Sequence, residues 1–403
     1  MTAFPGARGR APGLPRAHLR ILVVLATTQT LGWGALLFLP VLAPAIAADL
    51  GMSLTHVYAG TSLLFAAMAL ASPAAGRLFL RIGTRAAMTW GAVLCGLALA
   101  GVAAAPGALA LDLAWIVCGL GAAAFLATAP HVFLADVAGP RAARGLIGAL
   151  MLATGLSTAI IYPLTHWLQL AFGWRGAVAC LALLCALPLP LLTRALLPDA
   201  RPAPRAPADP AAAPPPSFYR SPVFLLLLAT LSLNSFASFG AETMGLELFR
   251  SLGAAPDVAL AAASAMALFK IGGRAVDILG GGRWDGLTTG LVSAVMMPAG
   301  LLALGLLGAS AWGIGLFLAL FATGAGAFAV SRATMALVFY EGADFARASA
   351  AISLPRNLCN ALAPPLLAAV LTGTGPAAML WILGLISLAA LGLILLLTRH
   401  RPV

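Results

Sequence analysis

Apolar runs long enough to cross a lipid bilayer follow one another along almost the whole chain. A helix crosses the hydrocarbon core with about 20 apolar residues, and charged or Gly/Pro clusters divide this chain into runs of that length. The runs do not alternate polar and apolar residues, which excludes membrane-spanning strands. We therefore predict an all-α membrane protein whose twelve spans lie at residues 20–46, 55–79, 86–105, 111–135, 146–170, 176–196, 222–246, 258–280, 287–308, 311–338, 349–372 and 377–397.

The composition excludes several classes of function. Hydrophobic residues make up 62% of the chain and charged residues 9%, whereas a soluble domain carries roughly 25% charged residues. The net charge of +11 does not indicate nucleic-acid binding, because the arginines lie in short loops without interleaved aromatic residues. No phosphate-binding Gly-rich loop is present, so we expect no ATP. The five cysteines lie inside apolar runs without paired spacing, so we expect no disulfide, metal or cofactor.

The loop arginines predict the orientation of the spans. If the N-terminus lies in the cytoplasm, 21 of the 23 Lys and Arg residues fall on the cytoplasmic side, and Arg175 and Arg250 are the exceptions. The positive-inside rule favours that orientation, and an even number of spans returns the C-terminus to the same side. The Ala-, Gly- and Arg-rich composition favours a bacterial inner membrane. We therefore expect a multi-pass monomer in that bilayer, with both termini cytoplasmic.

The chain contains an internal repeat. GRLFLRIG at Gly76–Gly83 and GRAVDILG at Gly273–Gly280 follow the second and eighth predicted spans, so they occupy corresponding places in two halves. A Pro- and Ala-rich stretch with the composition of a solvated linker joins the halves. Duplicated six-span halves are typical of secondary transporters. The predicted parts are a cytoplasmic tail at 1–19, a six-helix bundle at 20–196, a cytoplasmic linker at 197–221, a second six-helix bundle at 222–397 and a cytoplasmic tail at 398–403.

The first repeat element, GRLFLRIGTR, resembles the loop signature G-x-L-x-D-R-x-G-x-R of the major facilitator superfamily, with Leu80 in place of the acid. The resemblance extends over nearly the whole chain. It implies alternating access between two six-helix halves, and a loop that latches the cytoplasmic side. Leu80 therefore removes one charged contact from the latch of the first half. The motif residues are Gly76, Arg77, Arg81, Gly83 and Arg85 in the first half and Gly273, Arg274 and Asp277 in the second.

Shorter motifs resemble one branch of that superfamily. GWG at 32–34 and ALAPPL at 361–366 are similar to bacterial monocarboxylate-type and oxalate/formate-type transporters, and FGWR at 172–175 resembles the superfamily in general. The oxalate/formate-type antiporters hold a dicarboxylate with one cation on the eighth helix and one on the eleventh. Lys270 and Arg356 match that arrangement in kind. The resemblance implies a small organic anion as the substrate.

Deep ionisable residues support the same interpretation, because a charge at the bilayer centre costs about 3 kcal/mol. Lys270 lies about 18 Å into the eighth span and Arg356 about 12 Å into the eleventh, from opposite sides, at 1.5 Å per residue. Two structural alternatives stay open: Lys270 could pair with Asp277 on its own helix, and Arg356 with Glu341 or Asp344. Arg332 is expected at the headgroups.

Polar side chains cluster in spans that, by the same resemblance, line or flank the transport path. Single Ser, Thr or Asn residues often only bond across helices, but their concentration in the first, fourth, fifth, seventh and eleventh spans favours a lined cavity. Glu242, near the outer end of the seventh span, is our candidate for proton coupling. The candidate substrate-binding residues are Lys270, Arg356, Gln29, Trp33, His131, Tyr162, Asn234 and Asn360.

Two other functions stay open. A drug or toxicant exporter of the same fold is compatible with the aromatic residues near the path, although the fifth span has no Gly-Pro pair. A membrane acyltransferase would use His131 and Asp136, in the spacing H-x-x-x-x-D, as a base and its orienting acid. That spacing of two common polar residues is a weak signal, so we expect a transporter of a small solute and no enzyme.

Overall fold

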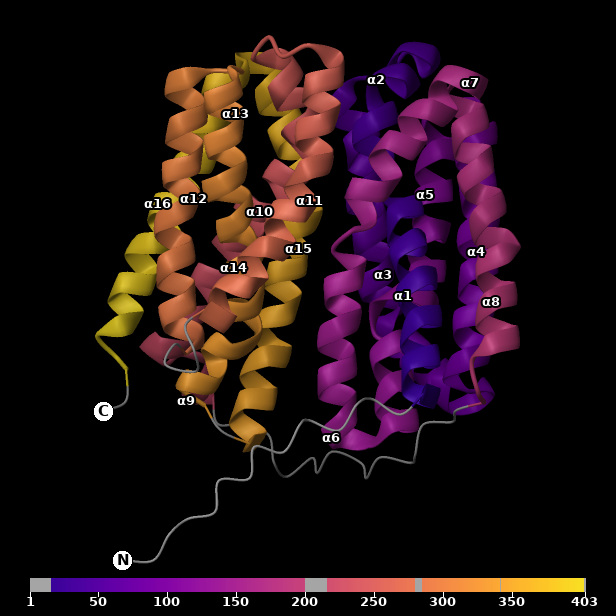
Figure 1. Ribbon diagram of the computed structural model, residues 1–403, viewed down its shortest axis with the longest axis horizontal. Helices are drawn as coiled ribbons and strands as arrows, with labels where there is room; N and C mark the ends of the chain where they lie inside the picture. The colour runs from indigo at the N-terminus through magenta and orange to yellow at the C-terminus, as the bar shows by residue number, and fades with distance from the viewer. Residues whose placement is uncertain (1–15, 200–215, 280–284, 341, 402–403) are drawn as a thin grey trace, which may run out of the picture.

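The computed structural model describes residues 16–199, 216–279, 285–340 and 342–401, and it is helical throughout these ranges except for short turns. The helices gather into two bundles that lie side by side (Figure 1). The first bundle contains α1 (Arg16–Leu36), α2 (Leu39–Leu50), α3 (Leu54–Ile82), α4 (Thr84–Ala104), α5 (Ala108–Ala122), α6 (Ala129–Thr154), α7 (Ser157–Ala186) and α8 (Pro188–Leu196). The second contains α9 (Pro216–Tyr219), α10 (Pro222–Ser251), α11 (Pro256–Leu279), α12 (Gly286–Leu307), α13 (Ala311–Phe317), α14 (Thr323–Thr334), α15 (Gly342–Thr374) and α16 (Pro376–Thr398).

The described helices overlap all twelve predicted spans. Nine stretches of the described chain are long and apolar enough to cross a membrane by length and composition. One of them, Leu146–Leu196, contains two helical segments, because α7 breaks at Gly173. Gly173 has a φ of 69°, a backbone conformation that favours glycine. The helices α11 and α15 are not among the nine, and they carry the deep cations Lys270 and Arg356. The prediction of an all-α membrane protein is confirmed.

Several boundaries differ from the sequence prediction. The first span is not one helix: the chain bends between Leu36 and Leu39, and α2 begins there with Pro40 in its first turn, where a proline is tolerated. The repeat motifs were expected in loops, but Gly76–Ile82 lie in the last turns of α3 and residues 273–279 in the last turns of α11, while Gly280 lies outside the described residues. The α3 helix ends only at Gly83, which adopts φ 84° to turn the chain into α4.

The two bundles meet mainly along two helix pairs, and α2 also contacts α10. The α3 helix packs against α15, and α7 packs against α11. The hydroxyl of Ser62 on α3 donates to the carbonyl of Ala361 on α15, so the α3–α15 contact includes a hydrogen bond between the bundles.

Matching π-helical turns interrupt one helix in each bundle. One lies at Ala123–Ala127 between α5 and α6, and the other at Leu318–Ala322 between α13 and α14. Such turns are rare inside α-helices and often occur at functional sites. Their corresponding places, in the fourth and tenth spans, extend the internal repeat from sequence to backbone geometry.

Candidate functional site

An ion pair inside the second bundle forms the centre of the candidate site. The Nζ atom of Lys270 on α11 lies 2.6 Å from Oε2 of Glu242 on α10. Both side chains are mostly buried, with 18% and 23% of their surfaces exposed. The structure therefore joins the predicted anion-binding lysine to the predicted proton-coupling acid. Asp277, the alternative partner of Lys270, has its side chain outside the described part of the chain.

Two glycines set the position of Lys270. A Cβ atom on Gly326 of α14 would overlap the carbonyl oxygen of Lys270, and a Cβ on Gly273 of α11 would overlap the carbonyl oxygen of Thr323. Only glycine fits these two places, because the opposing atoms belong to the backbone. The backbones of α11 and α14 therefore touch at the lysine itself and again about one turn further along α11, which fixes the depth of Lys270.

Two arginines, Arg332 and Arg274, lie within electrostatic range of Glu242, and a third, Arg356, lies within range of Arg332. Arg332 on α14 donates to Oγ of Ser235 on α10, at 3.4 Å, and lies within electrostatic range of Glu242, Arg274 and Arg356. Ser235 is thirteen residues from the start of α10, which corresponds to a depth of about 20 Å. The expectation that Arg332 sits at the headgroups is therefore wrong: its long side chain turns inward to a buried hydroxyl.

Of the other two arginines, one has an unsatisfied hydrogen-bond donor and one donates to the other bundle. Arg356 donates to Oδ1 of Asn357 at 3.3 Å, while its buried Nε atom has no hydrogen-bond partner among the described residues. Arg274 donates across the interface to the carbonyl of Met151 on α6. The carboxylates considered earlier for Arg356, Glu341 and Asp344, have side chains outside the described part. Among the described side chains, this cluster thus holds four cations and one acid, Glu242, and three of its positive charges have no paired anion.

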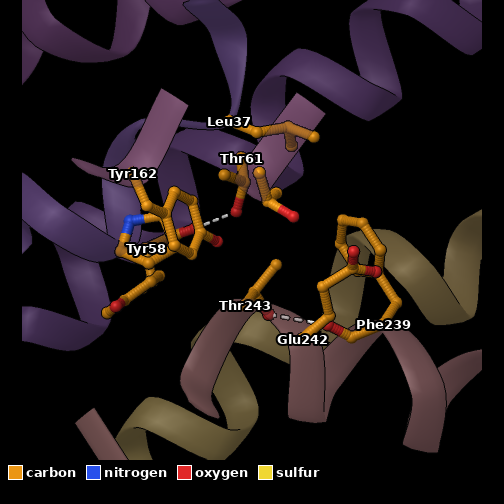
Figure 2. A pocket seen from close by; sticks show the side chains of 9 residues that line it. Leu37, Tyr58, Thr61, Tyr162, Phe239, Glu242 and Thr243 are labelled. Atoms are coloured by element: carbon orange, nitrogen blue, oxygen red, sulfur yellow. Dashed lines mark hydrogen bonds between the residues drawn. The ribbon is translucent and has the colours of Figure 1, made fainter. Parts of the chain in front are cut away.

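A small cavity lies on the other side of Glu242, between the two bundles. Figure 2 shows tyrosines of the first bundle facing Glu242, Phe239 and Thr243 of α10 across it. Its volume is about 10 Å³, which is the room needed by about one water molecule. The lining residues are Leu37, Pro40, Tyr58, Thr61, Thr158, Tyr162, Phe239, Glu242 and Thr243.

Aromatic side chains connect the bundles beside this cavity. The ring of Trp33 on α1 stacks on Phe65 of α3 with centroids 6.5 Å apart. Phe65 meets Phe239 of α10 edge to face at 5.2 Å. An apolar contact of this kind can separate when the bundles move, because it leaves no unpaired charge behind.

The remaining predicted binding residues differ in whether they already have hydrogen-bond partners within the protein. Gln29 is 1% exposed and donates to the carbonyl of Phe125 in the π-helical turn, at 3.2 Å. Asn234 is 3% exposed, donates to Sδ of Met297 and accepts from Ser238. His131 on α6 is half-buried, and Asn360 on α15 is half-buried with its Oδ1 atom unpartnered among the described residues. The structure brings Tyr162 to Glu242, but gives Gln29 and Asn234 partners within the protein.

The repeat motif is asymmetric in three dimensions. Arg77, Arg81 and Leu80 are exposed, and a Cβ on Gly76 would meet open space. Arg85 bonds to the carbonyl of Leu197 at 3.0 Å and to Asp199 at 2.9 Å, which attaches α4 to the chain after α8. In the second half, the corresponding Gly273 is tightly packed and Arg274 reaches the first bundle.

Sequence reasoning missed three residues of this region. Arg332 was placed at the wrong depth, and Tyr58 and Glu247 were not considered. Glu247 is 8% exposed and pairs with Arg250 at 2.8 Å. Its spacing of five residues from Glu242 could have drawn attention, because two acids in one spanning helix are unfavourable in lipid.

Comparison with known proteins identifies the fold. A sequence profile described as Major Facilitator Superfamily matches residues 22–331. Among solved structures, a single-site mutant of the nucleoside transporter NupG is similar at 14% identity with a TM-score of 0.74, covering 95% of this chain and 99% of that one. A D-xylose-proton symporter has 18% identity and a TM-score of 0.71, covering 95% and 98%.

A third similar structure is a bacterial homolog of the human lysosomal transporter Spinster, in an inward-facing and occupied conformation. It shares 15% identity, with a TM-score of 0.69 and coverage of 97% and 98%. No curated protein sequence matches this chain. At these identities the structures establish the fold alone, and their substrates are not carried over to this chain.

Proposed function

Because this chain belongs to the major facilitator superfamily, and is therefore a multi-pass secondary transporter rather than an enzyme, we propose that its substrate is a small organic anion carrying one or more carboxylates. The observation behind this proposal is the surplus of cations around Glu242. Lys270, Arg332 and Arg356 lie within the bundle, where an uncompensated charge is unfavourable. A carboxylate ligand would supply the missing negative charge.

Glu242 also suggests how transport is coupled. Its carboxylate occupies Lys270 as a substrate carboxylate would, so the two anions compete for one ammonium group. A proton on Glu242 would neutralise it and release Lys270 to the substrate. We infer a proton-coupled carrier in which protonation of Glu242 precedes anion binding, and the arginine-rich end of the bundle faces the cytoplasm.

The experiment that tests the substrate class is ligand-dependent thermal stability of the purified protein. A ligand that binds only the folded state stabilises it by about 2.7 kcal/mol at a concentration of 100 Kd. We would compare mono- and dicarboxylates with their methyl esters, which keep the shape and lose the charge, and with lipophilic cations. We expect stabilisation by free carboxylates alone, lost in Lys270→Gln and in Arg356→Gln but retained in the exposed control Arg77→Gln.

Two results would contradict the proposal. Equal stabilisation by acids and esters would show that charge does not determine binding. Stabilisation by lipophilic cations only would favour the exporter function, for which the Trp33–Phe65–Phe239 contact is the supporting feature. Uptake of the best-binding labelled carboxylate into proteoliposomes, with and without an imposed pH gradient, then tests transport and its coupling.

A further inference from the structure

An apolar groove lies on the second bundle, away from the candidate site. It is formed between α12 and α16, which pack against one another on the side of the second bundle that faces away from the first (Figure 1). Its lining includes the buried Leu301 and Leu380, and also Leu306 and Trp381, which are 75% and 69% exposed. Both helices are long and apolar enough to cross the membrane, so these exposed side chains face lipid and the groove opens to the hydrocarbon of the bilayer.

The groove starts at the end of the bundle where α12 stops and α16 begins. Along α16 its lining extends from Pro376 to Leu391, which is about 22 Å, and along α12 from Val295 to Leu306, which is about 16 Å. The hydrocarbon core of a bilayer is about 30 Å thick, so one leaflet contributes about 15 Å. The groove therefore covers at least the depth of one leaflet, which is the outer one in the predicted orientation.

Glycines leave this space open. A Cβ atom on Gly384 of α16 would meet open space, and a Cβ on Gly305 of α12 would only reach a methyl carbon of Leu380 at 4.0 Å. The corresponding spans of the first bundle, α4 and the second segment of α7, are closed against each other: a Cβ on Gly96 would overlap the backbone nitrogen of Ala186. The internal repeat therefore does not by itself produce the groove, which is a feature of the second bundle.

The dimensions of the groove indicate what can occupy it. Its volume is about 550 Å³, and division by a length of about 16–22 Å gives a cross-section of about 25–35 Å². A helix about 10 Å across has a cross-section of about 80 Å², so a spanning helix from a second copy does not fit. Water takes about 30 Å³ in the liquid and a methylene group is of similar size, so the volume corresponds to about eighteen methylene groups in a row.

The rest of this chain is poorly placed to enter the groove. The described ranges begin at α1, stop after α8 and α11, and end after α16, and all these points lie at the end of the molecule opposite the start of the groove (Figure 1). Any segment that continues from them would have to run along the bundle to reach Pro376. Lipid chains, in contrast, surround the exposed wall formed by Leu306 and Trp381.

We propose that this groove is a binding site for one acyl chain of a phospholipid from the leaflet at that end of the bundle. The bound chain contacts α12 and α16 on its two sides and Leu252 at the end of α10. Lipid tails are as apolar as leucine, so packing contacts rather than the hydrophobic effect favour the bound position. A chain held on several sides gains more of these contacts than a chain of the bulk bilayer, and it therefore exchanges more slowly.

The test is whether a phospholipid stays in the groove when bulk lipid is removed. The full-length protein is reconstituted in liposomes with a phosphatidylcholine that carries a photoreactive diazirine midway along one acyl chain. The protein is then washed in micelles of a mild detergent, illuminated and digested, and mass spectrometry locates the attached lipid. We expect the label on the α12 and α16 peptides that line the groove, and its loss in Gly384→Phe, because the added ring lies across the path of the chain.

Gly392→Phe is the matched control. Gly392 lies on the same helix, a Cβ there also meets open space, and the residue is outside the groove, so this variant should keep the label. Gly305→Phe enters the groove from the opposite wall and should lose the label as Gly384→Phe does. Thermal unfolding curves equal to that of the wild type confirm that the variants are folded.

Three outcomes would overturn the proposal. The first is equal labelling of α12 and α16 in the wild type and in Gly384→Phe. The second is a wild-type label spread over all lipid-exposed helices, which would mean that only bulk lipid was retained. The third is energy transfer between donor- and acceptor-labelled copies in liposomes that Gly384→Phe abolishes and Gly392→Phe preserves, since a second copy would then cover the groove.

Discussion

The pairing of Lys270 with Glu242 leads to a quantitative prediction about stability. At 2.6 Å, two unit charges attract one another by about 6 kcal/mol at an effective dielectric constant of about 20. Desolvation of both ions offsets part of this gross attraction, and removing one partner of a buried pair typically costs about 3–5 kcal/mol. Because about a fifth of each side chain is exposed, we expect the lower end of that range, about 3 kcal/mol, for each single substitution.

A double-mutant cycle separates the pairing from the side effects of each substitution. Glu242→Gln leaves the ammonium of Lys270 unpaired, and Lys270→Met leaves the carboxylate unpaired, so each variant should lose about 3 kcal/mol. The double variant leaves neither charge behind and should lose much less than the sum. We expect a coupling energy of about 2–3 kcal/mol, within the range measured for residues in contact.

The assay is reversible unfolding of the purified protein in mixed micelles of a mild and a denaturing detergent, monitored by tryptophan fluorescence and circular dichroism. Coincident transitions by the two probes would justify a two-state treatment. The same cycle on the exposed Arg77 with Glu242 serves as a control and should be additive. Additive losses for Glu242 and Lys270 would refute the reasoning, since they would show that the two charges do not stabilise one another in the folded protein.

Three further predictions follow from other contacts. Gly326→Val should prevent stable folding, because its side chain would meet the Lys270 carbonyl oxygen, whereas Gly76→Ala, in open space, should unfold at nearly the wild-type temperature. Arg175→Ala should cost about 1–2 kcal/mol in the same mixed-micelle assay, because Arg175 donates to Asp49 and to the carbonyls of Ala103 and Ala105; an unchanged midpoint would contradict this. Partial burial opposes ionisation of Asp285, but hydrogen bonds from Thr288 and the charge of Arg401 outweigh it and lower the pKa of Asp285. The stabilisation that ionised Asp285 gives the folded state is therefore complete well above the unfolded pKa of about 3.9, and it is lost as the pH falls through the lowered folded-state pKa. The difference in unfolding temperature between wild type and Asp285→Asn should accordingly vanish in acid.

Much of the fold follows from the sequence because bilayer insertion depends on length and hydropathy alone. A run of apolar residues can hide its backbone polar groups only as a helix, so counting such runs predicts the spans. Local interruptions were less predictable. The break before α2 has a visible cause in Pro40, but the π-helical turn at Ala123–Ala127 consists of Ala, Phe and Leu, which do not distinguish it from an ordinary helix.

The side-chain pairs within the site could not be predicted from the sequence, for a different reason. Lys270 and Glu242 lie 28 residues apart on different helices, so their contact depends on the rotation of each helix about its axis. The sequence offers Lys270 another acid, Asp277, two turns along the same face of its own helix. The error on Arg332 has a similar origin: a position near a helix end says little about where a long, flexible side chain places its charge.

The distribution of charge between the bundles constrains how transport can work. Among the described residues of the site, Glu242, Lys270, Arg332 and Arg356 all belong to the second bundle, while the first bundle contributes aromatic rings and hydroxyls. An anion bound by these cations would therefore stay with the second bundle when the two halves rock apart. The first bundle can respond to it only through groups that face Glu242 across the cavity, above all Tyr162. In the proposed coupling, a proton on Glu242 would weaken its attraction for Lys270 and would also change the group that Tyr162 of the first bundle faces. One proton would then alter both the affinity for the substrate and the contact between the halves.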